Sequence, residues 1–191
     1  MSMTVHTAAH IITGLWLIFT AYWFVRAFHN KRTVYRPNRF ARSWYYFPPA
    51  VVWLIVMHWS PGRVRLLPPS WTVRILGVTL CAAGIAVAIW ARTILGKNWS
   101  GQPTIKENHE LIRRGPYAVV RHPIYTGILL ALTGTLLALW PTLGGLILIA
   151  TVVVALRVKA RQEETLMTRE FPDAYPAYRR RVRYAIIPRV L

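Results

Sequence analysis

The stretch from Pro123 to Leu156 reads PIYTGILLALTGTLLALWPTLGGLILIATVVVAL and contains no charged side chain. A helix that crosses a hydrocarbon core of about 30 Å needs about 20 residues at 1.5 Å each. The stretch is too long for a single crossing, and the uncharged break at Trp140-Pro141-Thr142 divides it into two runs. It therefore predicts a membrane-embedded helical hairpin, with the break as its turn.

Three further apolar runs precede this hairpin. They extend from Ala8 to Phe28, from Tyr45 to Trp59, and from Trp71 to about Leu95. The run from Tyr45 and the second arm of the hairpin are short, so they need flanking aromatic or basic residues, or continuation into the interface, in order to span. Several runs end in tryptophan, whose amphipathic ring belongs at headgroup level. We expect an all-α integral membrane protein with about five transmembrane helices.

The composition also favours membrane insertion. Hydrophobic residues make up 54% of the 191 residues and charged residues only 16%, which is too little polar sequence for a water-soluble domain. The charge is one-sided, with 24 Lys plus Arg against 6 Asp plus Glu, and no acidic residue precedes Glu107. A disordered basic tail is excluded by the apolar content. The single cysteine, Cys81, excludes an intramolecular disulfide, a redox pair and a cysteine metal cage.

Basic residues alternate between the connections as membrane orientation requires. There are six from Arg26 to Arg42, three from Arg63 to Arg74, six from Arg92 to Arg121, none around Trp140 and nine from Arg157 onward. Because basic residues collect on the cytoplasmic side, this pattern predicts an outer N-terminus and a cytoplasmic C-terminus. We expect the inner membrane of a bacterial or archaeal cell.

The region after the hairpin predicts two cytoplasmic helical elements. No helix breaker occurs between Leu156 and Pro172, so the last transmembrane helix should continue into the cytoplasm, and a short helix should follow from Ala174 to Arg183. We expect one domain, residues 1–191. Residues 1–95 should form the first three transmembrane helices, and residues 96–191 should form a loop, the hairpin and the tail.

Two of the predicted helices carry small residues at the same spacing of 4, 3 and 4. The residues are Gly77, Cys81, Gly84 and Ala88 on one helix, and Gly127, Ala131, Gly134 and Ala138 on the other. In lipid, small side chains let helix backbones approach closely enough for dispersion to hold them together. We predict that the two stripes pack on each other, or each on another helix.

Ionisable residues are costly inside a membrane, and here they gather in two places that should face the cytoplasm. The first is the loop 97–125, which contains two histidines, two glutamates and two tyrosines. The second is the cytoplasmic end of the last transmembrane helix, with Glu163 and Glu164. A hairpin brings both places to one membrane face, so one pocket can use His122 and Glu163.

These elements occur in a recognisable order. Gly115-Pro116-Tyr117 is followed by Arg121-His122-Pro123-Ile124-Tyr125-Thr126-Gly127, then by the glutamate pair, and then by Tyr175, Tyr178 and Arg179. From about Ala88 to Pro188 this order resembles the isoprenylcysteine carboxyl methyltransferases, which are integral membrane enzymes that use S-adenosylmethionine. The resemblance implies that the cofactor is bound by Gln102, His109, Glu110, Leu111, Ile112, Tyr117, His122, Pro123, Ile124, Tyr125, Glu163 and Glu164.

The resemblance also implies which residues act on the substrate. The basic substrate-contacting residue of the family is usually an arginine just upstream of the glutamates, and the nearest residue here is Lys159, flanked by Arg157 and Arg161. The candidate catalytic residues are His122, Tyr125, Lys159 and Arg161. The residue types suit the cofactor, because a glutamate can accept from ribose hydroxyls and ammonium, and a tyrosine can form an aromatic wall.

The implied reaction is methyl transfer from S-adenosylmethionine to a lipophilic acceptor, in the first place an isoprenylcysteine-type carboxylate on a small molecule or prenylated substrate. Displacement by an ionised carboxylate needs alignment and a dry site but no general base. A phospholipid amine or a small thiol would need deprotonation, for which His122 is the candidate base. The related phospholipid methyltransferases carry a Gly-x-Gly element where this chain reads Cys81-Ala82-Ala83-Gly84, which argues against an amine lipid.

Other interpretations remain open at this point. Glu163 could form a surface ion pair with Lys159, and His122 could simply precede a helix that begins with proline. A small transporter or assembly subunit is a non-enzymatic alternative, although the centres of the helices lack ionisable residues. A membrane reductase of the sterol reductase type would bind NADPH instead. The basic tail from Arg179 predicts contact with anionic lipid headgroups and not with nucleic acid, while the oligomeric state stays unknown.

Overall fold

The computed structural model describes residues 3–35, 47–58, 64–68 and 70–188. The helices are α1 (Val5–Ala27), α3 (Phe47–His58), α4 (Trp71–Leu95), α5 (Pro123–Leu139), α6 (Leu143–Glu170) and α7 (Ala174–Arg181). Short 3-10 turns occupy Gly96–Asn98 and Gly115–Ala118, and two short strands are β1 (Thr33–Tyr35) and β2 (Ile105–Lys106).

Five apolar helices form where the hydrophobic runs predict them. Of these, α1, α4 and α6 are long and apolar enough to cross a membrane, whereas the apolar helices Phe47–Val56 and Pro123–Leu139 are shorter. The predicted run from Tyr45 to Trp59 begins and ends outside the described residues. The chain is therefore a mostly helical integral membrane protein.

Local capping explains where the helices begin. The Thr4 side chain accepts from the Thr7 amide at 3.1 Å, so α1 starts three residues before the predicted Ala8. Thr142 caps α6 in the same way through the Gly145 amide at 3.2 Å. Pro123 occupies the first turn of α5, where its missing amide hydrogen is not needed.

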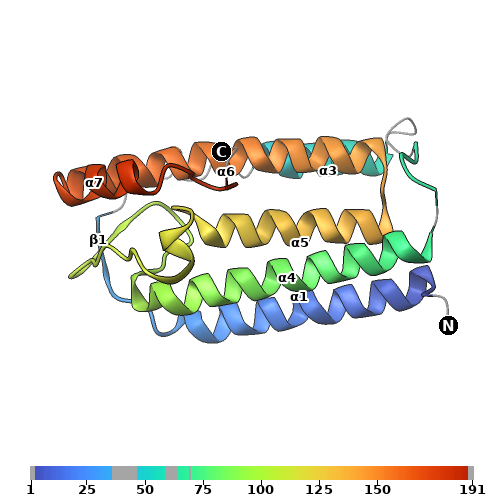
Figure 1. Ribbon diagram of the computed structural model, residues 1–191, viewed down its shortest axis with the longest axis horizontal. Coiled ribbons are helices and arrows are strands. Elements are labelled where there is room, and N and C mark those ends of the chain that lie inside the picture. The colour runs from blue at the N-terminus through green and yellow to red at the C-terminus, as the bar shows by residue number, and fades with distance from the viewer. Residues whose placement is uncertain (1–2, 36–46, 59–63, 69, 189–191) are drawn as a thin grey trace.

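The helices lie side by side along one direction, as Figure 1 shows. Helix α4 lies between α1 and α5, and α3 packs beside α6 on the other side of α5. Residues 140–142 connect α5 to α6, and the two helices run antiparallel. Helix α6 continues past Leu156 without a break to Glu170, and α7 follows it, as the absence of breakers predicts.

The two stripes of small residues pack on each other across α4 and α5. A Cβ atom on Gly77 would lie 2.6 Å from the Ala138 nitrogen, and one on Gly127 would lie 2.6 Å from the Ala88 nitrogen. The two other stripe glycines, on α4 and α5, also lack room for a Cβ atom. The first of the two predicted arrangements is therefore confirmed, and backbone contact holds this helix pair together.

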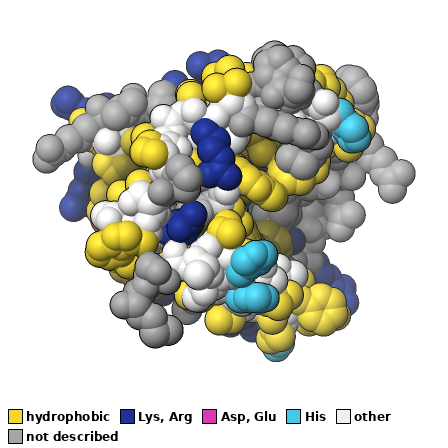
Figure 2. Space-filling model, turned by 90° about the vertical axis from the view of Figure 1, so that its right-hand side faces the viewer, with side chains coloured by type: hydrophobic (Ala, Val, Ile, Leu, Met, Phe, Trp, Pro, Cys, Tyr) yellow, Lys and Arg dark blue, Asp and Glu magenta, His cyan; other side chains and the backbone are white. Residues whose placement is uncertain are grey.

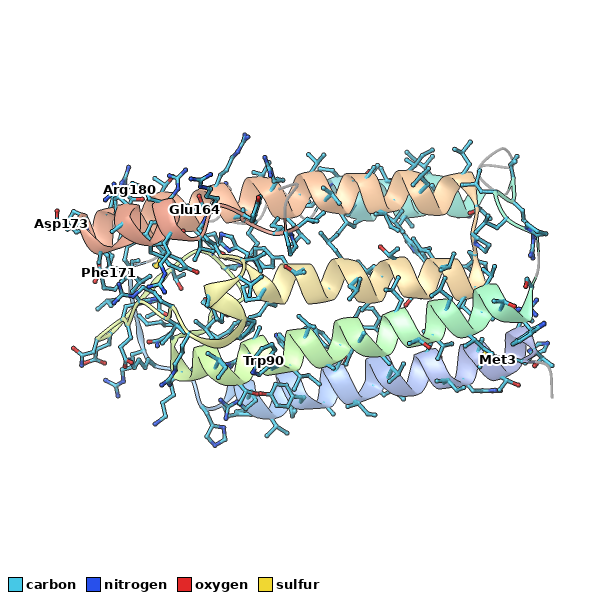
Figure 3. All side chains as sticks on the ribbon, in the orientation of Figure 1. Met3, Trp90, Glu164, Phe171, Asp173 and Arg180 are labelled. Atoms are coloured by element: carbon cyan, nitrogen blue, oxygen red, sulfur yellow. The ribbon has the colours of Figure 1, made fainter. Side chains whose placement is uncertain are left out.

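The two ends of the helix bundle differ in chemistry. At one end, which we call the turn end, lie Met3, residues 64–68, Ser70 and the turn 140–142. Figure 2 views this end and shows basic side chains, coloured alike for lysine and arginine, and histidine side chains, but no acidic one among the coloured atoms. At the other end, the loop end, lie residues 28–35, the loop 96–122, the end of α6, and α7, and Figure 3 shows Asp173 there, opposite Met3.

The loop end contains a small sheet that the all-α expectation misses. Strand β1 pairs antiparallel with β2, with Thr33 opposite Lys106, and the Glu107 amide donates to the Arg32 carbonyl at 2.9 Å. The Lys31 side chain extends the connection by donating to Glu110 at 3.0 Å. The segment after α1 is thereby joined to the loop that precedes α5. The pairing joins segments far apart in sequence, which local periodicity does not report.

Candidate functional site

A cavity of about 200 Å³ opens at the loop end between α5, α6, α7 and the loop 98–112. Its lining comes from segments far apart in the sequence, including α1. Most of the residues predicted for the site line it, namely Gln102, His109, Glu110, Leu111, Ile112, Tyr117, His122, Ile124, Tyr125, Lys159 and Glu163.

Three of the predicted residues lie outside the lining. Pro123 is fully buried at the start of α5, and Glu164 lies on the far side of His122 from Glu163. Arg161 is exposed on α6. Successive residues turn by about 100° on a helix, so Arg161 points to the opposite side from Glu163, two residues further on. Arg161 therefore does not line the cavity, because of its angular position on α6.

Other lining residues were not foreseen from the sequence. Trp23 comes from α1, Leu95 from the end of α4, and Met167 from the last turns of α6. The loop adds Asn98, Trp99 and Thr104. Trp99 lies four residues after the predicted end of α4, within the predicted polar loop, and this position is a usable signal. Trp23 comes near only through the packing of α1 on α4.

His122 is held between the two glutamates. Its Nδ1 lies 3.4 Å from Glu163 Oε2, and its Nε2 lies 3.2 Å from Glu164 Oε1. Burial alone would lower the pKa of His122, but the hydrogen bonds to both carboxylates outweigh burial and raise this pKa above its ordinary value. Only the doubly protonated ring donates to both carboxylates, so this arrangement favours the cationic form of His122.

Tyr125 completes the arrangement around Glu163. Its hydroxyl donates to Glu163 Oε1 at 2.6 Å, and its ring lies parallel to the His122 ring with centroids 5.3 Å apart. The Lys159 ammonium lies 5.2 Å from the centroid of the Tyr125 ring and donates to the Gly101 carbonyl at 2.8 Å. One carboxylate, one imidazolium and one ammonium thus meet at an aromatic wall.

Glu164 supports this site from behind. It accepts from Arg121 Nε at 2.7 Å and lies 3.6 Å from Arg179 Nε. The side chains of Arg121 and Glu164 are 8% and 11% exposed, so this ion pair is shielded from solvent. Removing one member would leave a buried charge without its partner. The two glutamates therefore have different roles: Glu163 faces the cavity, and Glu164 fixes Arg121 and His122.

The loop side of the cavity is less charged. Burial, followed by the nearby Lys31 and Lys106, lowers the pKa of His109 below its ordinary value. Its Nδ1 accepts the Lys106 amide hydrogen at 3.2 Å, so the neutral ring carries its proton on Nε2. Burial raises the pKa of the Tyr117 phenol, which keeps this lining residue uncharged.

The helix side of the cavity is apolar. Trp23 and Trp99 meet edge to face with ring centroids 6.2 Å apart, and Leu95 and Ile128 line the cavity beside them. The Arg92 guanidinium lies 4.6 Å from the centroid of the Trp99 ring and donates to the Gly96 carbonyl at 2.6 Å. The cavity therefore joins a charged half to an apolar half at the border of the helix bundle.

No group of three or more histidine, cysteine or acidic side chains that could hold a metal ion occurs within the described part of the chain. No curated protein matches the chain. A family model matches residues 70–169, which run from the residue before α4 almost to the end of α6 and include both His122 and the glutamate pair. The chain therefore belongs to the isoprenylcysteine carboxyl methyltransferase family and is a membrane methyltransferase.

Proposed function

We propose that the protein transfers a methyl group from S-adenosylmethionine to a lipophilic carboxylate, in the first place that of an isoprenylcysteine-type acceptor. The observation that carries the proposal is the two-sided cavity. Its charged half is formed by His122, Glu163 and Lys159, and its apolar half is formed by Trp23 and Trp99. A polar cofactor and a lipophilic acceptor can thus meet in one cavity.

The lining provides the groups that this cofactor requires. Its ammonium and ribose hydroxyls are donors that need acceptors, and its adenine needs an apolar or aromatic slot. Glu163 supplies carboxylate oxygens. Two further lining residues have a buried oxygen without a hydrogen-bond partner among the described residues, the Oδ1 of Asn98 and the Oγ1 of Thr104. A buried polar atom without a partner costs about 1–3 kcal/mol, so a bound ligand that supplies partners would be favoured.

The charge state of His122 favours a carboxylate acceptor over an amine or a thiol. When bound, S-adenosylmethionine supplies a methyl group activated by its sulfonium. An amine or thiol acceptor would need a base, but Glu163 and Glu164 favour the protonated form of His122, which has no lone pair for a further proton. Lys159 offers a positive charge that can orient an ionised carboxylate. The apolar walls formed by Leu95 and Ile128 exclude water from this half of the cavity.

The proposal includes the orientation of the chain. Among the described residues, the connections richest in lysine and arginine, 28–35 and 96–122, lie at the loop end together with the cavity, which supports a cytoplasmic loop end and an outer N-terminus. We place the protein in the inner membrane of a bacterial or archaeal cell, with residues 1–191 acting as one domain. The acceptor then reaches the apolar half of the cavity laterally from the bilayer.

Titration calorimetry with S-adenosylhomocysteine, the product of methyl transfer, tests the cofactor assignment. The detergent-purified protein should bind it, and NADPH should give no signal. Glu163→Gln should weaken binding at least tenfold, because a hydrogen bond to a charged group contributes about 1.5–3 kcal/mol. Glu170→Gln is the matched control, since Glu170 is exposed at the end of the same helix. Binding of NADPH alone, or equal affinity of the two variants, would contradict the assignment.

A further inference from the structure

The C-terminal end of α7 carries a dense group of arginines. Arg179, Arg180 and Arg181 end this helix and Arg183 follows it, and all four are exposed. One side of the helix is buried through Tyr175, Tyr178 and Val182, which pack together. The helix is therefore fixed to the protein by these buried residues, and its end exposes the four arginines, which we call the basic face.

Few negative charges are available to this basic face from within the protein. Glu164 approaches Arg179, but it is already engaged by Arg121 and His122. Asp173 precedes α7, whereas the arginines end it, about 10 Å further along the helix axis. Among the described residues, Arg180, Arg181 and Arg183 form no ion pair. These three exposed arginines are therefore open to an anionic group from outside the protein.

The segment after α7 connects this basic face to the candidate active site. Residues 182–187, which we call the C-terminal strap, run along the start of α5. The Arg121 amide donates to the Tyr184 carbonyl at 3.0 Å, and the His122 amide donates to the Ala185 carbonyl at 2.7 Å. The Thr126 hydroxyl donates to the carbonyl of Ile186, whose side chain is fully buried. The strap thus holds the backbone of His122.

Side-chain contacts strengthen the same connection. The Arg121 guanidinium donates to the carbonyls of Val182 and Arg183 at 2.7 and 2.6 Å while it also binds Glu164. Because Arg121 lies two residues before the apolar helix α5, Arg183 is held beside the start of this helix, the level at which α5 would leave the hydrocarbon layer. This is the depth of the lipid headgroups, where a basic residue gains roughly 1 kcal/mol from an anionic surface.

We infer that Arg180, Arg181 and Arg183 bind anionic lipid headgroups, and that this binding tightens the hold of the C-terminal strap on His122 and raises the affinity of the cavity for the cofactor. The inference rests on the proposed function. Lipid and cofactor both favour the conformation in which the strap is docked on the start of α5, so each raises the affinity for the other. The chemistry that recognises the lipid is a phosphate-bearing headgroup with a net negative charge.

The test compares the protein in two nanodiscs, one of phosphatidylcholine and one containing phosphatidylglycerol. S-adenosylhomocysteine carries one carboxylate and one ammonium. Because its net charge is zero, the negative surface potential of the anionic lipids does not change its concentration near the membrane. We expect phosphatidylglycerol to lower the Kd of S-adenosylhomocysteine about fivefold or more, because a factor of about five is the lower end of the coupling usually found between two binding sites. Without cofactor, hydrogen exchange at the Arg121 and His122 amides should slow in the anionic membrane, because the strap carbonyls accept from both.

Charge-matched variants separate a specific surface from general attraction. In the double variant that combines Arg180→Gln with Arg183→Gln, phosphatidylglycerol should no longer change the Kd or the hydrogen exchange rates. The Kd in phosphatidylcholine should equal that of the wild type. The control pair Arg114→Gln and Arg169→Gln removes equal charge from exposed residues at the same end and should keep the effect.

The outcomes distinguish the inference from the function on which it rests. If the wild-type protein binds the ligand equally in both nanodiscs, or if the lipid effect survives in the Arg180 and Arg183 pair, the inference is wrong and the proposed function stands. If inorganic phosphate reproduces the effect in detergent, the surface binds free anions and not lipid. If no ligand binds in either membrane, the proposed function fails, and the exchange rates of Arg121 and His122 alone decide whether the lipid fixes the strap.

Discussion

Glu164 should be a strong determinant of stability although it does not line the cavity. It binds Arg121 at 2.7 Å and His122 at 3.2 Å, and the three side chains are no more than 11% exposed. Breaking such a buried ion pair by removing one charge usually costs about 3–5 kcal/mol. We expect Glu164→Gln to lower the free energy of unfolding by at least about 3 kcal/mol, whereas Glu170→Gln, exposed on the same helix, should change it by less than about 0.5 kcal/mol.

The same substitution should change how stability depends on pH. The pKa of His122 is raised in the folded protein, so its contribution is fully present below its unfolded pKa of about 6.5 and is lost as the pH rises through the folded value. Each unit of this difference corresponds to about 1.4 kcal/mol. In Glu164→Gln one of the two carboxylates that raise the pKa is gone, so the loss of stability with rising pH should shrink.

Thermal unfolding in nanodiscs across pH 5 to 9 measures both effects on the wild type and the two glutamine variants. If Glu164→Gln unfolds at the temperature of Glu170→Gln, the buried network does not contribute as the geometry indicates. An unchanged pH dependence in Glu164→Gln would show that this carboxylate does not hold the proton on His122.

Three further predictions follow from individual contacts. Gly134→Ala should separate α4 from α5 and lower the free energy of unfolding by about 1–3 kcal/mol, the cost of an overpacked contact. Gly14→Ala is the control, because a Cβ atom on Gly14 meets nothing within 4 Å. Equal melting temperatures of the two variants would refute the close approach of α4 and α5. Tyr125→Phe removes the 2.6 Å hydrogen bond to Glu163 and should raise the Kd of S-adenosylhomocysteine about tenfold in calorimetry, with an unchanged Kd as the contrary result. Lys159→Met should raise KM for a carboxylate acceptor at least tenfold with little change in the Kd of the product cofactor, and a loss confined to cofactor binding would move this residue to the cofactor site.

The helices could be predicted because the signals that specify them are local. Transfer of an apolar run into hydrocarbon depends on the run itself, so α1, α4, α5 and α6 form close to their predicted bounds. The contact between the stripes on α4 and α5 was also predictable, since small residues at matching spacing are a local pattern with one favourable partner.

Features that join distant segments were not predictable from periodicity. The strands β1 and β2 pair although α3 and α4 lie between them in the sequence, and Trp23 reaches the cavity only through the packing of α1. The C-terminal strap is held through its backbone carbonyls, whose partners the residue types of the strap do not encode. Arg161 was expected at the site because it lies two residues from Lys159 in the sequence. Its exposed position depends on which side of α6 faces the cavity, and the sequence does not give that orientation.

The most direct test of the central claim is a methyl transfer assay with S-adenosylmethionine that carries a labelled methyl group. The acceptors are an S-prenylated cysteine with a free carboxylate and the same compound with its carboxylate converted to an amide. We predict label in the first compound alone, released as methanol by base as expected for a methyl ester, and lost in Glu163→Gln. Label in the amide compound, stable label on an amine lipid, or transfer undiminished in Glu163→Gln would contradict the account.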